Sequence, residues 1–164
     1  MKITNYIPRL PFVKSNGTMK KEDIKYLIVH HEGVKTPLFY DTYKRTLTDA
    51  RVHVAKGWGH ISYHYVIDNV GDIFQCLPET EVGYHAGNLD INKHSIAVCI
   101  QGNYEVQNFT LKQQKALRDL CTYLFTARPD LPNLVWDGLK GHREVRDGCT
   151  VCPGKNVFNV IKSW

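Results

Sequence analysis

The heptapeptide SIAVCIQ, residues 95–101, says most about how this chain folds. Its central residues, Ile96 to Ile100, are all apolar, and Lys93 and Gly102 bound the run on either side. A short apolar run with such limits is typical of a strand that is buried on both faces of a sheet. A sheet buried on both faces needs helices above and below it. We therefore expect this strand to lie inside an α/β domain.

The segments around this strand predict the rest of such a domain. Further strands are expected where β-branched and aromatic residues gather between turn residues, namely at Lys25–His30, His60–Asp68, Ile73–Leu77 and Leu134–Trp136. Helices are expected at Tyr40–Lys56, Leu111–Arg128 and Gly154–Lys162. Thr110 precedes the second helix and Gln113 follows three positions on, which is the pattern of a capping box. Interleaved strands and helices imply a single α/β domain, with a central mixed β-sheet flanked by helices.

The chain of 164 residues fits one domain that is large enough to bury a core. Residues 1–20 are expected to be an irregular lead-in, because Pro8, Pro11 and Gly17 oppose regular structure, and residues 21–164 form the domain itself. The longest apolar run has five residues, so we expect no membrane insertion. The first residues lack the apolar stretch of a signal peptide, so we expect synthesis in the cytoplasm.

Charge and cysteine content add two expectations. The formal net charge of +5 suits an anionic partner, but the basic residues are scattered and no nucleic-acid recognition motif accompanies them. We therefore expect no nucleic-acid partner. The five cysteines are an odd number without the spacing of a disulfide framework, which favours a reducing compartment.

A histidine and a cysteine in the last quarter of the chain suggest its chemistry. Cys152 follows His142 by ten positions, and an imidazole and a thiolate that meet at a turn form half of a soft-ligand zinc site. The adjacent pair His30 and His31, at the end of an expected strand, offers a third ligand. Three protein ligands leave the fourth tetrahedral position open, which distinguishes catalytic zinc from structural zinc. The pattern indicates a metal hydrolase.

The residues alone leave alternatives open. Neighbouring side chains on a strand face opposite ways, so only one of His30 and His31 can reach the metal. Cys149 precedes Cys152 by three positions and is a competing thiolate; as a fourth ligand it would make the site structural. A single histidine is more often a hydrogen-bonded core residue than a ligand. A zinc nucleobase deaminase is disfavoured, because Pro153 follows the cysteine pair instead of preceding it.

Six short segments occur in an order that matches a known family. They are LIVHH (27–31), SYHYVID (62–68) followed by Gly71, VGYHAG (82–87), SIAV (95–98), GHRE (141–144) and CPG (152–154). In this order they resemble the zinc-dependent N-acetylmuramoyl-L-alanine amidase type 2 family, which includes bacteriophage T7 lysozyme and the peptidoglycan recognition proteins. Each segment is a weak signal, but six in sequence are a strong one.

The resemblance implies a reaction and a set of site residues. The reaction is hydrolysis of the amide between the lactyl group of N-acetylmuramic acid and L-alanine in peptidoglycan. The implied ligands of one Zn²⁺ per chain are His30, His142 and Cys152. The implied active-site residues are Tyr63 and Thr150, and the implied substrate-binding residues are His85, Gly87 and Asn88.

Two features are not settled by the resemblance. The spacing of ten between His142 and Cys152 is longer than the family's usual spacing of about eight, with extra length around residues 146–149, which puts the role of Thr150 in question. The general base is not identified. Glu32 and Glu144 are candidates, because each lies two positions from a histidine ligand.

A wall substrate without a signal peptide favours the catalytic domain of a phage or prophage endolysin. We expect such a protein to act on the bacterial cell wall as a monomer. One alternative is a cytoplasmic amidase that recycles wall fragments. The other is a non-catalytic peptidoglycan-binding module, although relatives of that kind typically lack the cysteine ligand.

Overall fold

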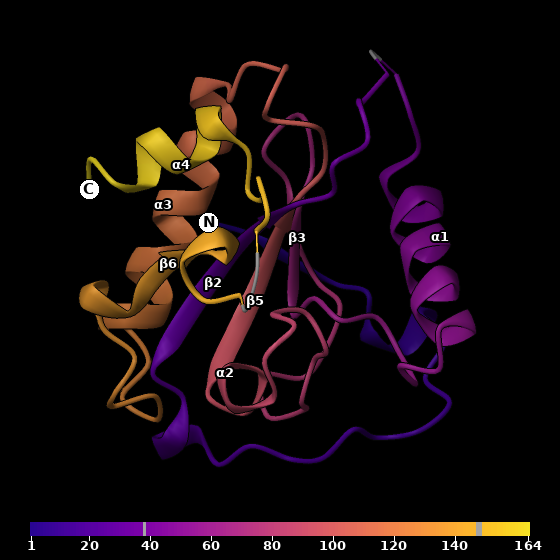
Figure 1. Ribbon diagram of the computed structural model, residues 1–164, viewed down its shortest axis with the longest axis vertical. Helices are drawn as coiled ribbons and strands as arrows, with labels where there is room; N and C mark the ends of the chain where they lie inside the picture. The colour runs from indigo at the N-terminus through magenta and orange to yellow at the C-terminus, as the bar shows by residue number, and fades with distance from the viewer. Residues whose placement is uncertain (38, 147–148) are drawn as a thin grey trace.

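One mixed sheet runs through the molecule, as the computed structural model shows (Figure 1). The structure describes residues 1–37, 39–146 and 149–164, and within these ranges six strands pair in the order β1-β4-β3-β5-β2-β6. Their bounds are β1 Ile3–Asn5, β2 Tyr26–His31, β3 Tyr65–Ile67, β4 Ile73–Gln75, β5 Ser95–Ile100 and β6 Leu139–Gly141. The β3–β4 pair is antiparallel, whereas the other described pairs are parallel. The expected α/β fold with a central mixed sheet is confirmed.

Strand β5 lies inside the sheet, between β3 and β2, and all of its residues are buried. Its side chains alternate between two hydrophobic clusters. Val98 and Ile100 belong to the larger cluster on one face, whereas Cys99 belongs to the smaller cluster on the other. The apolar run is continuous because both faces of this strand are covered.

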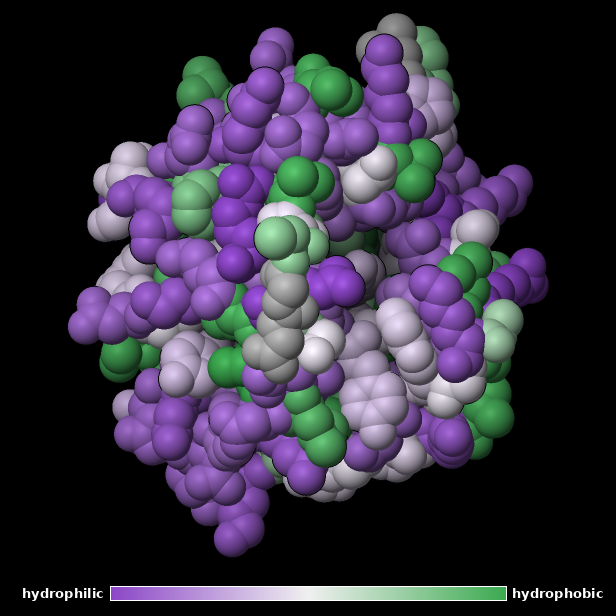
Figure 2. Space-filling model, in the orientation of Figure 1, coloured by the Kyte–Doolittle hydropathy of each residue, from purple (hydrophilic) through white to green (hydrophobic). Residues whose placement is uncertain are grey.

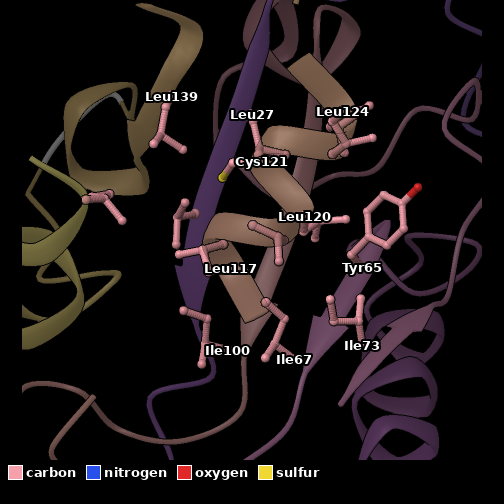
Figure 3. Packing of buried hydrophobic residues seen from close by; sticks show 14 of the residues in the cluster. Leu27, Tyr65, Ile67, Ile73, Ile100, Leu117, Leu120, Cys121, Leu124 and Leu139 are labelled. Atoms are coloured by element: carbon pink, nitrogen blue, oxygen red, sulfur yellow. The ribbon is translucent and has the colours of Figure 1, made fainter. Parts of the chain in front are cut away.

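Helices cover both faces of the sheet, with α1 on one side and α3 and α4 on the other (Figure 1). Their bounds are α1 Thr42–Ala55, α2 Leu89–Lys93, α3 Leu111–Thr126 and α4 Lys155–Ile161. Leu117, Leu120 and Leu124 of α3 are fully buried and point toward the sheet (Figure 3). Burial of each such side chain contributes about 1.5–3 kcal/mol. The smaller cluster includes Ala50 of α1 and Cys99 of β5.

Helix α3 begins with the capping box that its sequence predicts. Thr110 Oγ1 accepts a hydrogen bond from the backbone N–H of Gln113 at 3.3 Å, and Gln113 Oε1 accepts one from the backbone N–H of Thr110 at 3.2 Å. The two bonds satisfy donors that a helix start leaves unpaired. The helix ends at Thr126, slightly before the expected Arg128.

Two expectations about strands are wrong. The segment Leu134–Trp136 is not a strand: a 3-10 turn occupies Trp136–Gly138, and the strand β6 follows it. The apolar residues of this segment signal burial, since Leu134 packs into the larger cluster. The lead-in is not irregular throughout, because Ile3–Asn5 forms β1 and pairs with β4 at the edge of the sheet.

Short elements account for the remaining differences. Strands β3 and β4 are shorter than the expected His60–Asp68 and Ile73–Leu77. The five-residue helix α2 was not expected, because it is too short for a periodic pattern. Its start is capped by Asn88, whose Oδ1 accepts a hydrogen bond from the N–H of Ile91 at 3.1 Å.

The surface seen in Figure 2 is mostly hydrophilic, with hydrophobic side chains in small scattered groups. Scattered groups of this kind are ordinary for a folded domain. Within the described part of the chain, no helix has both the length and the apolar character needed to cross a membrane.

Candidate metal centre

Three side chains converge at one end of the sheet. His30 comes from β2, His142 from the 3-10 turn that follows β6, and Cys152 from the turn before α4. One ligand atom from each lies within 4.8 Å of the other two. The Sγ atom of Cys152 is 3.7 Å from Nδ1 of His30, and the rings of His30 and His142 have centroids 4.4 Å apart. The structure therefore brings together the three residues that the sequence suggests as ligands.

The sheet explains this convergence. Strands β2 and β6 are parallel neighbours, with Val29 paired to Gly141. The residues that follow this pair, His30 near the end of β2 and His142 just after β6, therefore lie at the same end of the sheet. The intervening chain, which includes α3, packs on the sheet and returns to it.

Side-chain alternation separates His30 from His31. His30 pairs with Cys99 of β5 and lies on the same face of the sheet, the face covered by α1. His31 points the other way, and its Nδ1 accepts a hydrogen bond from the N–H of Tyr104 at 3.1 Å. Among the described residues, the ligand cluster contains neither His31 nor Cys149.

Hydrogen bonds orient both imidazoles of the cluster. Nε2 of His142 donates to the carbonyl oxygen of Ala86 at 3.2 Å, which leaves Nδ1 of the neutral ring without a proton. Nε2 of His30 lies 3.0 Å from Nδ1 of His85, on the side of the ring away from Cys152. Each ring therefore uses Nε2 for a protein contact and has Nδ1 available as a ligand atom.

Burial sets the protonation states of the cluster. It lowers the pKa of His30 well below its usual value and also lowers the pKa of His142, so both imidazoles are neutral at neutral pH. Burial raises the pKa of the Cys152 thiol to about 12, partly opposed by the backbone N–H of His31, which donates to Sγ at 3.4 Å. A divalent cation would offset this cost of ionising the thiol.

The turn that carries Cys152 is held by polar contacts. Thr150 Oγ1 accepts a hydrogen bond from the N–H of Cys152 at 3.2 Å. The carbonyl oxygen of Cys152 accepts one from the N–H of Arg143 at 2.9 Å, and the guanidinium of Arg143 donates to the carbonyl oxygen of Val151. These bonds tie the turn to the residue that follows His142. Of the long spacing between the two ligands, residues 147–148 lie outside the described residues.

A cavity of about 410 Å³ opens over the cluster and is lined by all three of its residues, as well as by Tyr63 and Thr150. The ring of Tyr63 lies 5.4 Å from that of His30, measured between centroids. Burial raises the pKa of Tyr63 well above its ordinary value, so its hydroxyl keeps its proton at neutral pH. The site thus combines ligand atoms with a partly buried hydrogen-bond donor.

A second cavity of about 400 Å³ adjoins the first, because His85, His142 and Arg146 line both. Gly87 and Asn88 line only this second cavity. The backbone of Gly87 has a positive φ of 69°, and an added Cβ would meet the side chain of Arg146 at 3.5 Å. The two cavities together form a groove that extends beyond the cluster toward α2.

The two candidate bases lie in different surroundings. Glu32 lines the first cavity, but its carboxylate is held by Arg45, whose Nε lies 2.7 and 2.8 Å from the two oxygens. Glu144 does not line the cavity. One of its oxygens accepts a hydrogen bond from the N–H of Gly141 at 2.7 Å, and the other pairs with Lys162 at 3.0 Å. The structure therefore does not bring Glu144 into the site.

Helix α1 contributes two titratable cavity residues that sequence reasoning missed, Asp49 and His53. Burial and the nearby Glu32 raise the pKa of Asp49 to about 7. His53 accepts a hydrogen bond at Nδ1 from the N–H of Ser62 at 3.1 Å, and burial lowers its pKa to about 4. The available signal was their spacing of four, which places two polar side chains on the face of the helix that also carries the buried Thr46.

Both the sequence and the fold of this chain are similar to those of known proteins. The model of the Amidase_2 family, described as N-acetylmuramoyl-L-alanine amidase, matches residues 20–155. The chain belongs to this amidase family. The match spans every residue of the ligand cluster and Tyr63.

Relatives of this amidase family include both enzymes and recognition proteins. Peptidoglycan-recognition protein SC2 of Drosophila simulans is 27% identical over 146 residues, which cover 86% of this chain and 74% of the relative. The solved structure of the N-acetylmuramoyl-L-alanine amidase LysC from Clostridium intestinale URNW has a TM-score of 0.74 at 25% identity, covering 99% of this chain and 96% of that one. Drosophila peptidoglycan recognition protein SD shares the fold, with a TM-score of 0.80 at 20% identity and coverage of 100% and 95%.

Proposed function

We propose that this chain is a zinc-dependent N-acetylmuramoyl-L-alanine amidase. Its substrate would be the amide that joins the lactyl group of N-acetylmuramic acid to L-alanine in peptidoglycan. The observation that carries the proposal is the cluster of His30, His142 and Cys152 beneath an open cavity. Membership of the amidase family supports the same reaction.

The donor set fits zinc. Two imidazole nitrogens and one thiolate are ligands that zinc commonly takes, and both histidines are neutral here. Usual zinc–sulfur and zinc–nitrogen bond lengths place two tetrahedral ligands about 3.5 Å apart, close to the 3.7 Å between Cys152 Sγ and His30 Nδ1. We expect one ion per chain on these three residues. The described residues supply no fourth member of the cluster, as a catalytic site requires.

A zinc ion held there would supply Lewis acidity, which polarises a carbonyl oxygen and lowers the pKa of water to about 7. Side chains around the cavity would supply the hydrogen bonds to the reacting groups. Tyr63 keeps its proton because of its burial, so it would donate a hydrogen bond to the oxygen that gains negative charge. Thr150 accepts a bond from Cys152 and retains its own hydroxyl proton for a second, weaker donor role.

The proton of the attacking water needs an acceptor in the cavity. Glu32 lines the cavity, but both of its carboxylate oxygens are held by Arg45, and Glu144 lies outside the cavity. Asp49 lines the same cavity with a pKa of about 7, close to the value that suits a general base at neutral pH. We therefore assign the proton-accepting role to Asp49, which leaves Glu32 and Arg45 to set its environment.

The groove formed by the two cavities would receive the substrate, with Gly87 and Asn88 along its extension. We propose that residues 21–164 carry the catalytic site, with β1 completing the sheet, and that the protein acts as a monomer on the bacterial cell wall. A phage or prophage endolysin and a recycling amidase would use the same site on different substrates, intact wall and soluble fragments.

Purified peptidoglycan sacculi test the reaction directly. Cleavage of the proposed amide frees the α-amino group of L-alanine, so amino-group labelling followed by hydrolysis should identify N-terminal alanine as the new end group. A different new end group would contradict the proposed bond. Parallel assays on intact sacculi and on soluble muropeptides separate the endolysin role from the recycling role.

The similarity to recognition proteins favours one second candidate, a module that binds peptidoglycan without cutting it. Co-sedimentation of the zinc-loaded chain with sacculi, without release of amino groups, would support that module. The enzyme is expected instead to release amino groups and to stop when zinc is chelated.

A further inference from the structure

Histidine 85 is buried, and both of its ring nitrogens already have protein partners. Its Nδ1 lies 3.0 Å from Nε2 of His30, and its Nε2 lies 3.1 Å from Oγ of Ser95. Ser95 is fully buried on β5, and its hydroxyl donates to the carbonyl oxygen of Ile91 at 2.6 Å. A continuous line of hydrogen bonds therefore leads from the ligand His30 to a backbone carbonyl of α2.

The carbonyl at the end of this line sets the direction of every bond in it. A carbonyl oxygen only accepts hydrogen bonds, so the single hydroxyl proton of Ser95 is donated to the carbonyl oxygen of Ile91. Ser95 Oγ must then accept from Nε2–H of His85. In a neutral His85 ring, Nδ1 has no proton and accepts from Nε2–H of His30. Nδ1 of His30 therefore carries no proton, and it lies on the side of the ring that faces Cys152.

Burial is consistent with these bond directions, because it lowers the pKa of His30 and of His85 well below their usual values and keeps both rings neutral. The segment 85–86 also orients the other imidazole ligand, because the carbonyl oxygen of Ala86 accepts a hydrogen bond from Nε2 of His142. The segment is itself anchored: Oδ1 of the buried Asn92 accepts from the N–H groups of His85 and Ala86, at 3.1 and 2.8 Å.

We propose that His85 and Ser95 are positioning residues that fix the tautomer and orientation of His30 for zinc. We call the hydrogen bonds that run from His30 through His85 and Ser95 to the carbonyl oxygen of Ile91 the His85 relay. Helix α2 supports this relay, since it provides Ile91 and Asn92. Outer partners of this kind commonly change metal affinity by about 10–100-fold. The role rests on the proposed function only for the identity of the metal.

Zinc affinity measured by competition with a chromophoric chelator tests the relay without any substrate. Ser95→Ala removes the acceptor of His85 and should weaken zinc binding about 10–100-fold. Ser62→Ala is the matched control, because Ser62 is also buried but its Oγ has no hydrogen-bond partner among the described residues. Its zinc affinity should equal that of the parent chain. Equal affinities for the two variants would overturn the proposal.

Two substitutions of His85 keep the test independent of Ser95. The Oδ1 atom of an asparagine can take the place of imidazole Nδ1, so His85→Asn should retain zinc affinity better than His85→Leu. If His85 instead contacts substrate, both variants would raise KM and leave zinc affinity unchanged. That result would also overturn the proposal.

Nitrogen NMR of the metal-free chain gives a third, structural readout. With ¹⁵N-labelled histidine, the parent should show His30 protonated at Nε2, and Ser95→Ala should show a mixture of tautomers. A parent protonated at Nδ1 would contradict the relay. Neither this measurement nor zinc affinity requires turnover, so a chain that shows both effects without cleaving sacculi would refute the proposed function and leave the relay standing.

Discussion

The Sγ atom of Cys152 lies 3.7 Å from Nδ1 of His30, although 122 positions separate the two residues in the chain. The contact exists because β6 pairs with β2 and brings His142 and the turn of Cys152 to the end of the sheet where His30 lies. An unfolded chain does not hold these atoms together. We therefore expect binding of a metal at this cluster to be coupled to folding of the domain.

Zinc should consequently raise the stability of the parent chain. A ligand that binds only the folded state stabilises it by about 2.7 kcal/mol when its free concentration is 100 times the dissociation constant. Thermal unfolding followed with and without a strong chelator should show a lower Tm for the chelated sample, restored by added zinc. Identical Tm values under the two conditions would contradict a zinc site that forms on folding.

Replacement of the sulfur ligand should abolish stoichiometric zinc binding. Cys152→Ser exchanges a soft thiolate for a hydroxyl that stays protonated at neutral pH, so the purified variant should contain little zinc by elemental analysis and should not cleave sacculi. Cys149→Ser is the matched control, because Cys149 is exposed and lies outside the cluster of described residues. It should keep one zinc ion and full activity. The opposite outcome would make Cys149 the ligand.

Removal of the Tyr63 hydroxyl should separate metal binding from turnover. Tyr63 lines the cavity and is not a member of the ligand cluster, so Tyr63→Phe should bind zinc like the parent. Its turnover should fall by about 10²–10³-fold if the hydroxyl stabilises developing negative charge. Tyr123→Phe, on α3 and outside the cavity, should retain the parent's rate. An undiminished rate for Tyr63→Phe would remove Tyr63 from the mechanism.

The residue types of the cluster were predictable from the sequence, whereas the choice of His30 and Cys152 over His31 and Cys149 came from the resemblance to the amidase family. Strand alternation already requires that only one of His30 and His31 reach the metal. Deciding between them needs the identity of the face that each side chain occupies, which depends on where α1 docks. The pairing of His30 with Cys99 supplies that information. No local pattern contains it.

Contacts between distant elements were not predictable for the same reason. Arg45 binds Glu32 only because α1 lies against the end of β2, and Asp49 enters the cavity through the same docking. The relay of His85 depends on α2, a helix of five residues that leaves no periodic signal. The capping box at Thr110 was predictable because both of its partners lie within one turn.

Loss of this capping box should cost stability without touching the site. Thr110→Ala removes the oxygen that accepts from the N–H of Gln113, and such substitutions cost about 1 kcal/mol. Urea denaturation should show a lower midpoint at an unchanged slope. Zinc affinity should be unaffected, because the cluster lies on other elements. An unchanged midpoint would mean that the cap contributes nothing measurable here.

The carboxyl of Asp49 should make stability depend on pH in an identifiable direction. Its pKa of about 7 in the folded chain lies well above the value of about 3.9 in an unfolded one. Between these two values the folded state retains a proton that the unfolded state has released, so the free energy of unfolding falls as pH rises through this window.

Asp49→Asn cannot ionise and should lack this fall. Urea denaturation from about pH 4 to pH 7.5 should therefore show the variant gaining stability relative to the parent as pH rises. Asp119→Asn, at an exposed ion pair with Lys115, should show no comparable trend. A constant difference between Asp49→Asn and the parent across the range would mean that Asp49 is ionised throughout, and it would also withdraw Asp49 as the proton acceptor.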